Sequence, residues 1–418
     1  MARTRVGVDI GSTAVRVAEV TVDEIPVLVR AAQVLVPAGA VEGGEIRDPA
    51  IVAEALREVL VKAGVATKQV YLGVGNQRVV VRDVALPWLP EKELRDTLAF
   101  QVQEFIPMAV DDAVLDFDPL GEMDQGGRRM QRILLVAAHK GMVNALVAAA
   151  HAAELEPRGI DLTPFAVVRA VGTGDETLDL DSPGDEAVID VGAHVTSICV
   201  HDRGTTRFVR MLPSGGRDLT RAVAGGLGVP DDVAERLKRG DVGDVEEDVE
   251  RGAEYSADAP EADFPSSVED ANGPSGDVAP AAGTNDLVPA DGFTDLAARP
   301  RDDGPTPANR SEAPDPEQAH ALALAAAGGF VDEVRSSLDF YAAEVPNAHI
   351  GRMLVVGGGS RLDGFVELLE ERFPMPVDRG PLFERVKSEL DLSAEATVEA
   401  EAVLPVAVGL AIPERRRA

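Results

Sequence analysis

Hydrophobic and polar positions follow two different periods along the chain, and these periods alternate. Residues 5–10 form an apolar, β-branched run, and residues 14–21 alternate apolar and polar side chains, which predicts two strands before a third beyond an acidic turn. At 49–63 the apolar positions recur at helical spacing and stop at Gly64, which indicates a helix. Residues 70–74 predict a short buried strand. We therefore expect an α/β protein.

Residues 78–160 predict a separate β-α-β-β-α-β unit inserted into this pattern. Its strands are expected at 79–86, 113–120, 131–138 and near 158–162, with a Gly-rich turn over 121–129. Its helices are expected from Pro90 to Pro107 and over 141–153. These elements together predict a small α+β subdomain. At its edge, Trp88 is either an anchor for a peptide partner or a core residue.

The pattern of the N-terminus recurs after this unit. Apolar strands are predicted at 188–191, 195–200 and 206–211, and a further buried strand at 353–356 runs directly into Gly357. The second half of the chain is therefore expected to repeat the strand arrangement of the first.

Residues 241–316 depart from both periods. They carry 20 acidic and 4 basic side chains and 10 of the 28 prolines, and their apolar residues are scattered. Such a segment cannot bury enough apolar surface to offset the entropy of ordering, so we expect a disordered acidic insert. Either a solvated spacer or a partner-binding segment fits this composition. The insert contributes −16 of the net charge of −32, so the rest of the chain is only moderately acidic.

The net charge argues against nucleic-acid or anionic-lipid binding, since both depend on basic side chains. The single cysteine cannot form an internal disulfide, and the sequence shows neither a signal peptide nor an apolar run of the roughly 18 residues that span a bilayer. We therefore expect a cytoplasmic protein without direct membrane insertion.

Three segments place glycine directly after a predicted strand, where the backbone can approach a ligand closely. The first consists of Asp9, Gly11, Ser12 and Thr13, followed by Arg16. The hydroxyl and backbone N–H groups of Ser12 and Thr13 suit phosphate oxygens, and the carboxylate of Asp9 suits hydrated Mg²⁺. A single turn of this kind is also ordinary hairpin chemistry.

The other two segments favour a nucleotide site over an ordinary hairpin turn. The second consists of Asp190, Gly192, His194 and Thr196, and the third of Gly357, Gly358, Gly359, Ser360 and Arg361. Two Asp-Gly turns that face each other across a cleft would grip a triphosphate from both sides, with both carboxylates on one metal ion. A bare Gly loop suits a flat base, on which Arg361 can stack. His194 contributes either its side chain or only its backbone.

These motifs resemble the actin-like ATPase superfamily, which includes actin, the seventy-kilodalton heat-shock chaperones, sugar kinases and the division protein FtsA. Within the superfamily, the chain is similar to the PilM family of type IV pilus assembly proteins. The family-specific similarity lies in the segments 81–87, 104–107, 114–117, 134–138, 159–166, 215–220 and 234–238. About 340 residues take part in the resemblance.

The resemblance implies a two-lobed α/β fold with ribonuclease H-like lobes that bind ATP and Mg²⁺ between them. The first lobe would comprise 1–77, a connecting helix in 161–183 and the return of the chain in 386–418. The second lobe would comprise 184–240 and 317–385, the latter with a connecting helix and the adenosine loop. The subdomain would be 78–160, and the acidic insert 241–316. By the same resemblance, Gly215 and Gly216 belong to the site, and Glu235 and Lys238 lie near the ribose and adenine; alternatively, the last two are an ordinary helix pair.

Two positions depart from the family pattern. Relatives usually carry lysine at Arg16, so the phosphate contact is expected to differ in geometry. Relatives commonly have an acidic residue at Thr163, where the chaperones orient the attacking water. Threonine is no carboxylate base, so we expect slow ATP hydrolysis or binding without turnover. Asp161 either compensates for Thr163 or is a structural turn residue.

The resemblance implies a cytoplasmic component of the pilus assembly platform, recruited to the inner face of the membrane through partners. PilM-like proteins hold the N-terminal cytoplasmic peptide of the inner-membrane protein PilN, here expected in a groove between the first lobe and the subdomain. Other platform proteins are expected partners, and the oligomeric state, including a homo-oligomer, stays open. An FtsA-like division protein and a small-molecule kinase are the alternatives, as are related secretion or DNA-uptake machines.

Overall fold

The computed structural model describes residues 3–173, 184–240, 315–345 and 348–414. The chain divides into two compact units, residues 1–243 with 316–418 and residues 244–315. Every helix and strand named below belongs to the first unit. Residues 241–314 of the expected acidic insert lie outside the described residues; at its end, Pro316 begins a helix.

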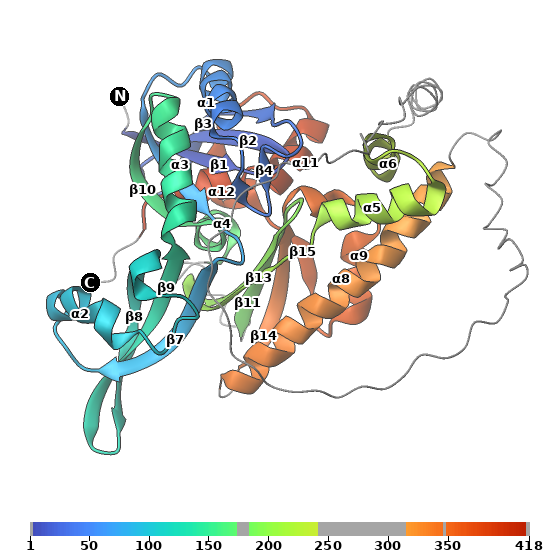
Figure 1. Ribbon diagram of the computed structural model, residues 1–418. Helices are drawn as coiled ribbons and strands as arrows, with labels where there is room; N and C mark the ends of the chain where they lie inside the picture. The colour runs from blue at the N-terminus through green and yellow to red at the C-terminus, as the bar shows by residue number, and fades with distance from the viewer. Residues whose placement is uncertain (1–2, 174–183, 241–314, 346–347, 415–418) are drawn as a thin grey trace, which may run out of the picture. The chain divides into compact units, whose positions relative to one another are not determined.

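A six-stranded sheet contains the N-terminal strands and has the order β10-β6-β1-β2-β3-β16 (Figure 1). Its strands are β1 Thr4–Ile10, β2 Ala14–Thr21, β3 Val27–Leu35, β6 Gln69–Val74, β10 Glu156–Leu162 and β16 Lys387–Ser388. β1, β2 and β3 are antiparallel neighbours, whereas β6 runs parallel to β1. The helices α1 (Pro49–Ala63) and α3 (Lys140–Ala152) pack together beside this sheet.

Local capping sets the limits of α1. The Asp48 side chain accepts hydrogen bonds from the backbone N–H groups of Ala50 and Ile51, and Pro49 occupies the first helical position. Gly64 ends the helix in the left-handed conformation. Both signals are local, and the helix has the predicted limits.

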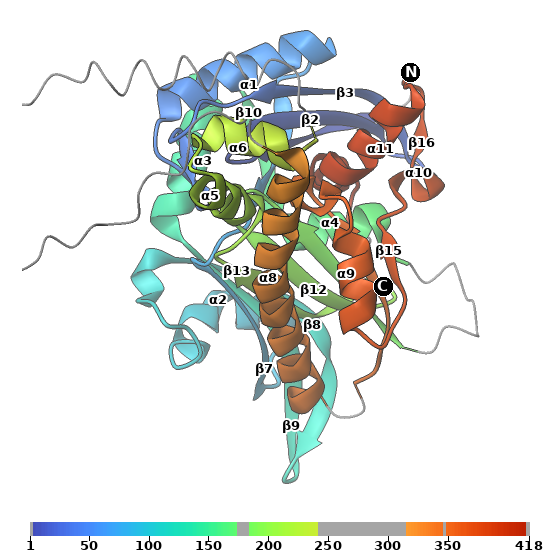
Figure 2. The same cartoon turned by 90° about the vertical axis from the view of Figure 1, so that its right-hand side faces the viewer.

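The second sheet has five strands in the order β13-β12-β11-β14-β15. They are β11 Asp185–Val191, β12 Thr196–Asp202, β13 Thr205–Leu212, β14 Ile350–Val356 and β15 Val377–Arg379. As in the first sheet, the first strand pairs antiparallel with the second and parallel with a later one. The helices α5 (Gly216–Leu227), α6 (Asp231–Lys238), α8 (Pro316–Glu344) and α9 (Phe365–Arg372) flank it, and α8 runs along it in Figure 2.

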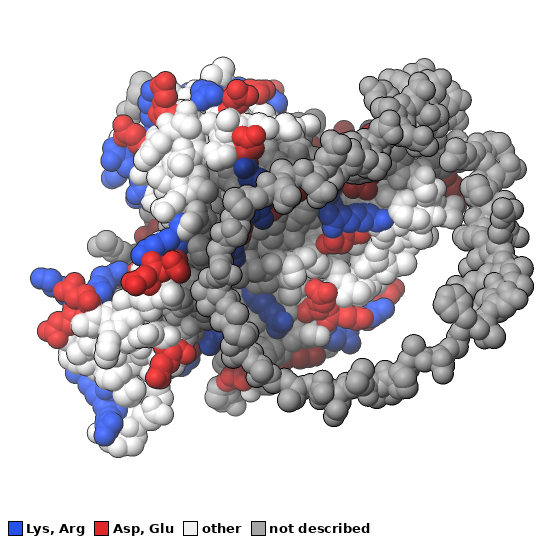
Figure 3. Space-filling model, viewed as in Figure 1, with Lys and Arg blue, Asp and Glu red and all other residues white. Residues whose placement is uncertain are grey.

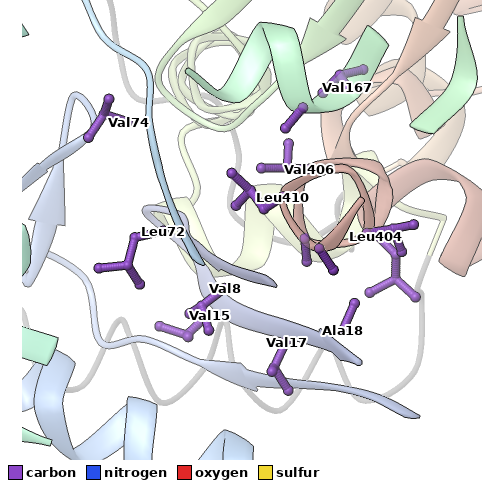
Figure 4. Close-up of a cluster of buried hydrophobic side chains, with 14 of the residues drawn as sticks. Val8, Val15, Val17, Ala18, Leu72, Val74, Val167, Leu404, Val406 and Leu410 are labelled. Carbon is purple, nitrogen blue, oxygen red and sulfur yellow. The ribbon is translucent and has the colours of Figure 1, made fainter. Parts of the chain in front are cut away.

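Two short helices pack between the sheets. α12 (Pro405–Ala411) contacts β1, β2 and β6, and α4 (Thr163–Val171) contacts both α12 and the strands β11 and β12. Figure 4 shows Val406 and Leu410 of α12 among Val8, Val15 and Leu72 of the first sheet. α11 (Ala394–Val403) precedes α12, and the small elements β4, β5 and α10 are Val41–Glu42, Glu45–Ile46 and Leu382–Arg385.

A three-stranded sheet of order β7-β9-β8 has its own core with α2. Its elements are β7 Val79–Pro87, β8 Ala113–Gln125, β9 Arg128–His139 and α2 Glu91–Gln101. The expected helix to Pro107 is too long, because the chain turns after Gln101 and returns Val102 and Ile106 to this core. The expected turn over 121–129 is also too long. Gly126 and Gly127 both have positive φ and form a two-residue hairpin turn, so most of 121–129 is strand.

The predicted β-α-β-β-α-β composition of the subdomain is wrong in its last two elements. β10 pairs parallel with β6 in the six-stranded sheet. The apolar face of α3, with Met142, Leu146 and Ala149, packs into the main core rather than into that of the subdomain. Both elements carry the expected periodicity, but periodicity does not show which sheet an element joins. The domain boundaries themselves stay predictions.

Trp88 lies beside the β8–β9 hairpin and is not a core residue. Its ring lies 4.0 Å from the Arg129 guanidinium, and its Nε1–H donates to Glu122 at 2.9 Å. The ring is 37% exposed. The alternative of a partner anchor stays a prediction.

Acidic and basic side chains are interspersed over the face of the described residues shown in Figure 3. None of the helices in the described ranges is long and apolar enough to cross a membrane.

Candidate functional site

A cavity of about 630 Å³ lies where the turns after β1 and β11 and the loop after β14 come together. The two turns have the same hydrogen bond. The Gly11 N–H donates to the Ala14 carbonyl at 3.0 Å, and the Gly192 N–H donates to the Val195 carbonyl at 3.1 Å. The repetition seen in the sequence is thus also a repetition of backbone geometry, one copy from each sheet.

Most of the residues singled out from the sequence line this cavity. They are Asp9, Gly11, Ser12, Thr13, Arg16, Thr163, Asp190, Gly192, His194, Gly216, Glu235, Lys238, Gly357, Gly358, Gly359 and Arg361. They come from segments up to about 350 residues apart in the chain, and the two sheets bring them to one place.

Four of the singled-out residues do not line the cavity. Thr196 is buried and its hydroxyl donates to the Ser214 carbonyl, and the Ser360 hydroxyl donates to the Gly357 carbonyl. Gly215 packs against the carbonyls of residues 192 and 193. The Asp161 carboxylate binds the Arg169 guanidinium. This ion pair favours the structural alternative for Asp161, and its role beside Thr163 stays a prediction.

The carboxylates of Asp9 and Asp190 both line the cavity, close enough for the charge of Asp9 to act on Asp190. Asp9 forms an ion pair with Arg16 at 3.3 Å, and both side chains are 14% exposed. Burial raises the pKa of Asp9 even though Arg16 acts to lower it. Burial together with the negative charge of Asp9 raises the pKa of Asp190 to about 7, against a smaller opposing effect of Arg16. Such a pair repels itself unless a proton or a cation lies beside it.

The Gly loop after β14 fits against the second turn at backbone distance. Gly357 has φ of +90°, and a Cβ atom there would lie 2.4 Å from the Val191 carbonyl oxygen. A Cβ atom at Gly359 would lie 2.5 Å from the Val191 side chain, whereas one at Gly358 would meet no atom within 4 Å. The loop therefore needs glycine on its packed side and presents bare backbone on the other.

Lys238 and Glu235 form one wall through a network rather than as a solvated helix pair. The Lys238 ammonium donates to the Gly216 carbonyl at 2.9 Å, the Thr220 hydroxyl at 2.8 Å and the Glu235 carboxylate at 2.6 Å. Burial lowers the pKa of Lys238, against the opposing charge of Glu235. Burial acts to raise the pKa of Glu235, but the charge and hydrogen bond of Lys238 outweigh it and lower the pKa.

The cavity has polar atoms that fit an anionic ligand. The Nε of Arg16 and the Nδ1 of His194 are buried and have no hydrogen-bond partner among the described residues. Burial, with the charges of Arg217 and Arg221, lowers the pKa of His194, so its imidazole is held neutral. The volume is within the range of small-molecule sites. The described residues hold no cluster of three or more His, Cys, Asp or Glu side chains that would bind a metal without further ligands.

Several lining residues escaped the sequence analysis. They include Gln33, Leu35, Arg217, Arg239 and Glu399. Gln33 and Leu35 lie at the end of β3, and Glu399 lies on α11 without a motif around it. Arg217 lies inside the recognised segment 215–220 and Arg239 directly follows 234–238, so these two are the residues that the sequence could have shown.

Comparison with solved structures shows the fold. A PilM-PilN type IV pilus biogenesis complex has a chain with 21% identity and a TM-score of 0.71, and the match covers 98% of each chain. The ethanolamine utilization protein EutJ from Carboxydothermus hydrogenoformans gives 15% identity and a TM-score of 0.48, with 99% of this chain and 90% of that chain covered. MreB 5 of Spiroplasma citri gives 12% identity and a TM-score of 0.45, with 98% and 95% covered. The match with a TM-score of 0.71 shows that the fold is the two-lobed actin-like fold predicted from the sequence.

Two family models match the sequence. The model described as cell division protein FtsA matches residues 187–397, which contain all of the five-stranded sheet except the first two residues of β11. The model described as type IV pilus assembly protein PilM matches residues 7–251, which contain most of β1, the other strands of the first sheet up to β10, the three-stranded sheet and the second turn. The resemblance drawn from the sequence is confirmed. The chain belongs to the family of the type IV pilus assembly protein PilM.

Proposed function

We propose that the chain binds ATP with Mg²⁺ in the cavity between the two sheets. The observation that supports this most is the pair of Asp-Gly turns with the same backbone hydrogen bond, one from each sheet, which line one cavity together with the unpartnered Arg16 Nε and His194 Nδ1 atoms. Asp9 and Asp190 would hold the Mg²⁺, which commonly takes one or two carboxylates besides phosphate and water. Ser12, Thr13 and the residues after Gly192 would hold the phosphates.

The other end of the nucleotide would lie against the Gly loop and the Lys238–Glu235 wall. Gly358 offers bare backbone there, and Arg361 lines the same part of the cavity. Mg²⁺ neutralises the charge of the phosphates and of the two aspartates when it is bound. The experiment is a calorimetric titration of the full chain with Mg·ATP and, separately, with ATP in EDTA. Binding that needs Mg²⁺ supports the proposal, whereas no measurable Mg·ATP binding contradicts it.

We expect slow hydrolysis, because the cavity residue Thr163 has a hydroxyl where a general base would stand. A Cβ atom at Gly75 would lie 2.0 Å from the Thr163 Oγ1. The absence of a side chain at Gly75 therefore provides the space that the side chain of residue 163 occupies. A correctly placed base contributes at least about 100-fold to a rate. Thr163→Glu should therefore raise the rate of phosphate release at least about tenfold, even with imperfect placement. Thr163→Gln has the same shape without the base and should not raise it; equal rates for the two variants would contradict the assignment.

We further propose that the chain serves as a pilus assembly component that holds the N-terminal cytoplasmic peptide of a PilN-like inner-membrane protein, and that this recruits it to the inner face of the membrane. The match to the PilM family model and the similarity to a chain of a PilM-PilN type IV pilus biogenesis complex support this. The expected groove lies between the six-stranded sheet and the three-stranded sheet. Fluorescence polarisation of a labelled peptide of this kind, with and without Mg·ATP, tests it. The FtsA match keeps a division role as the second candidate, for which a tubulin-like partner should bind instead.

A further inference from the structure

Glu399, in the second half of α11, links the two sheets at the cavity wall. Its Oε1 accepts a hydrogen bond from the Nε2 of Gln33 at 3.0 Å. The same oxygen lies 3.5 Å from the Nη1 of Arg361. Gln33 belongs to β3 of the six-stranded sheet, and Arg361 belongs to the 3₁₀ turn Gly358–Arg361 that follows β14 of the five-stranded sheet. All three side chains line the cavity.

The helix that carries Glu399 is also fixed to the Gly loop. The Gly357 N–H donates to the Ala402 carbonyl, one turn after Glu399, at 2.7 Å. The Ser360 carbonyl accepts a hydrogen bond from Arg379 at 3.1 Å, which fixes the other end of the same loop. The contact between Glu399 and Gln33 therefore joins β3 to a helix that is itself attached to the second sheet.

The geometry of a guanidinium group explains how Glu399 can act on a ligand. Arginine donates hydrogen bonds in the plane of its guanidinium group, whereas it stacks on rings with its flat face. Glu399 Oε1 lies 3.5 Å from the Nη1 of Arg361, a terminal nitrogen in the guanidinium plane, so an ion pair through this edge would leave the face available. A carboxylate at this edge thus orients the face without competing with a base for it.

We propose that Glu399 is a positioning residue for the base of the bound nucleotide. It orients the face of Arg361 toward the purine ring, and it ties this arginine to β3 so that base binding and the contact between the sheets are coupled. The inference rests on the nucleotide site proposed above. Because Glu399 and Arg361 are each 40% exposed, solvent weakens the ion pair, and a ligand can shift the balance between linked and separated sheets.

The first experiment separates the base from the phosphates. Affinities for Mg·ATP and for Mg·tripolyphosphate, which has no base, are measured for the wild-type chain, Glu399→Ala and Glu399→Gln. The control is Glu395→Gln, an exposed position on the same helix. Glu399→Ala should weaken ATP binding about three- to tenfold and leave tripolyphosphate binding within about twofold. Glu399→Gln should lose less, since its amide oxygen can still accept the hydrogen bond from Gln33 and face the Arg361 guanidinium.

The outcomes distinguish this inference from the proposed function. ATP binding by the wild-type chain that Glu399→Ala leaves unchanged overturns the inference and keeps the nucleotide site. Equal weakening of both ligands also overturns it, because Glu399 would then be a general brace. A wild-type chain that binds neither ligand contradicts the proposed function and the inference together.

A second experiment tests the link without a ligand. Hydrogen exchange of the segments 31–37 and 357–362 should be about threefold faster in nucleotide-free Glu399→Ala than in the wild-type chain or Glu395→Gln. Unchanged exchange would show that Glu399 does not couple β3 to the Gly loop, and would overturn that part of the proposal. A loss of the whole fold would instead raise exchange in every segment, so the remaining segments serve as the internal control.

Discussion

Asp190→Asn should stabilise the nucleotide-free chain and at the same time remove its affinity for Mg·ATP. Burial of the Asp190 carboxylate and the negative charge of nearby Asp9 raise the pKa of Asp190 to about 7. At pH 8 the Asp190 carboxylate is therefore charged and buried in the folded chain, whereas water solvates it in the unfolded chain. The uncharged amide removes this cost, and we expect the free energy of unfolding to rise by about 1–3 kcal/mol. Binding of Mg·ATP should weaken by at least about tenfold, because a metal-holding carboxylate is lost.

The pH dependence follows from the same shift. The folded chain keeps the Asp190 proton up to about pH 7, while the unfolded chain releases it near the ordinary pKa of aspartate. Asp190 therefore contributes most stability below about pH 4, and this contribution is lost as the pH rises through 7. The free energy of unfolding of Asp190→Asn should exceed that of the wild-type chain least near pH 4 and most above pH 7. Chemical denaturation monitored at pH 4.5 and pH 8 measures it.

Asp9→Asn is the matched control. Asp9 is the ion-pair partner of Arg16, and removal of its charge leaves a mostly buried guanidinium without that partner. This variant should lose Mg·ATP affinity as well, but it should gain less stability than Asp190→Asn, because loss of the Asp9 charge also leaves Arg16 without its ion-pair partner. A gain in Asp9→Asn as large as that in Asp190→Asn would contradict this description of the site. Affinity for ATP in EDTA should change little in Asp190→Asn, which separates loss of the metal from general damage.

The elements that were predicted correctly from the sequence depend on signals within a few residues. The strand at 14–21 and the helix at 49–63 have the limits that the pattern indicated, because alternation, the Asp48 cap and Gly64 act within a few residues. The Asp-Gly turns were recognisable for the same reason. In the β8–β9 hairpin, by contrast, several glycines and polar residues offered competing turns, and the twist of the paired strands selected Gly126 and Gly127.

The rest depends on contacts between distant segments. β10 has an ordinary strand pattern, and only its parallel pairing with β6 shows that it belongs to the six-stranded sheet. The sequence left open whether Asp161 compensates for Thr163 or is a turn residue, and only the folded chain shows that its carboxylate binds Arg169 of the next helix. Gln33 and Glu399 are separated by more than 360 residues and meet through the packing of α11, for which no motif exists.

Gly409→Ala should destabilise the chain strongly although alanine favours helices. A Cβ atom at Gly409 on α12 would lie 1.8 Å from the Ala166 carbonyl oxygen and 2.4 Å from its carbon, both of them backbone atoms of α4. On another side of the same helix, a Cβ atom at Gly7 of β1 would lie 2.0 Å from the Ala407 carbonyl oxygen. α12 thus has no free space in which to shift away from α4. We expect the free energy of unfolding to fall by about 2–4 kcal/mol, measured by chemical denaturation.

Gly328→Ala is the control for this prediction. Gly328 lies inside α8, and a Cβ atom there would meet no atom within 4 Å, so only helix propensity changes. That variant should be more stable by up to about 1 kcal/mol. Because Thr163 begins α4 and Pro405 and Val406 of α12 line the cavity, displacement of α12 should also weaken Mg·ATP binding in Gly409→Ala but not in Gly328→Ala. Equal stability of the two variants would mean that α4 and α12 separate without cost, and the two helices would then not be the rigid support of the cavity.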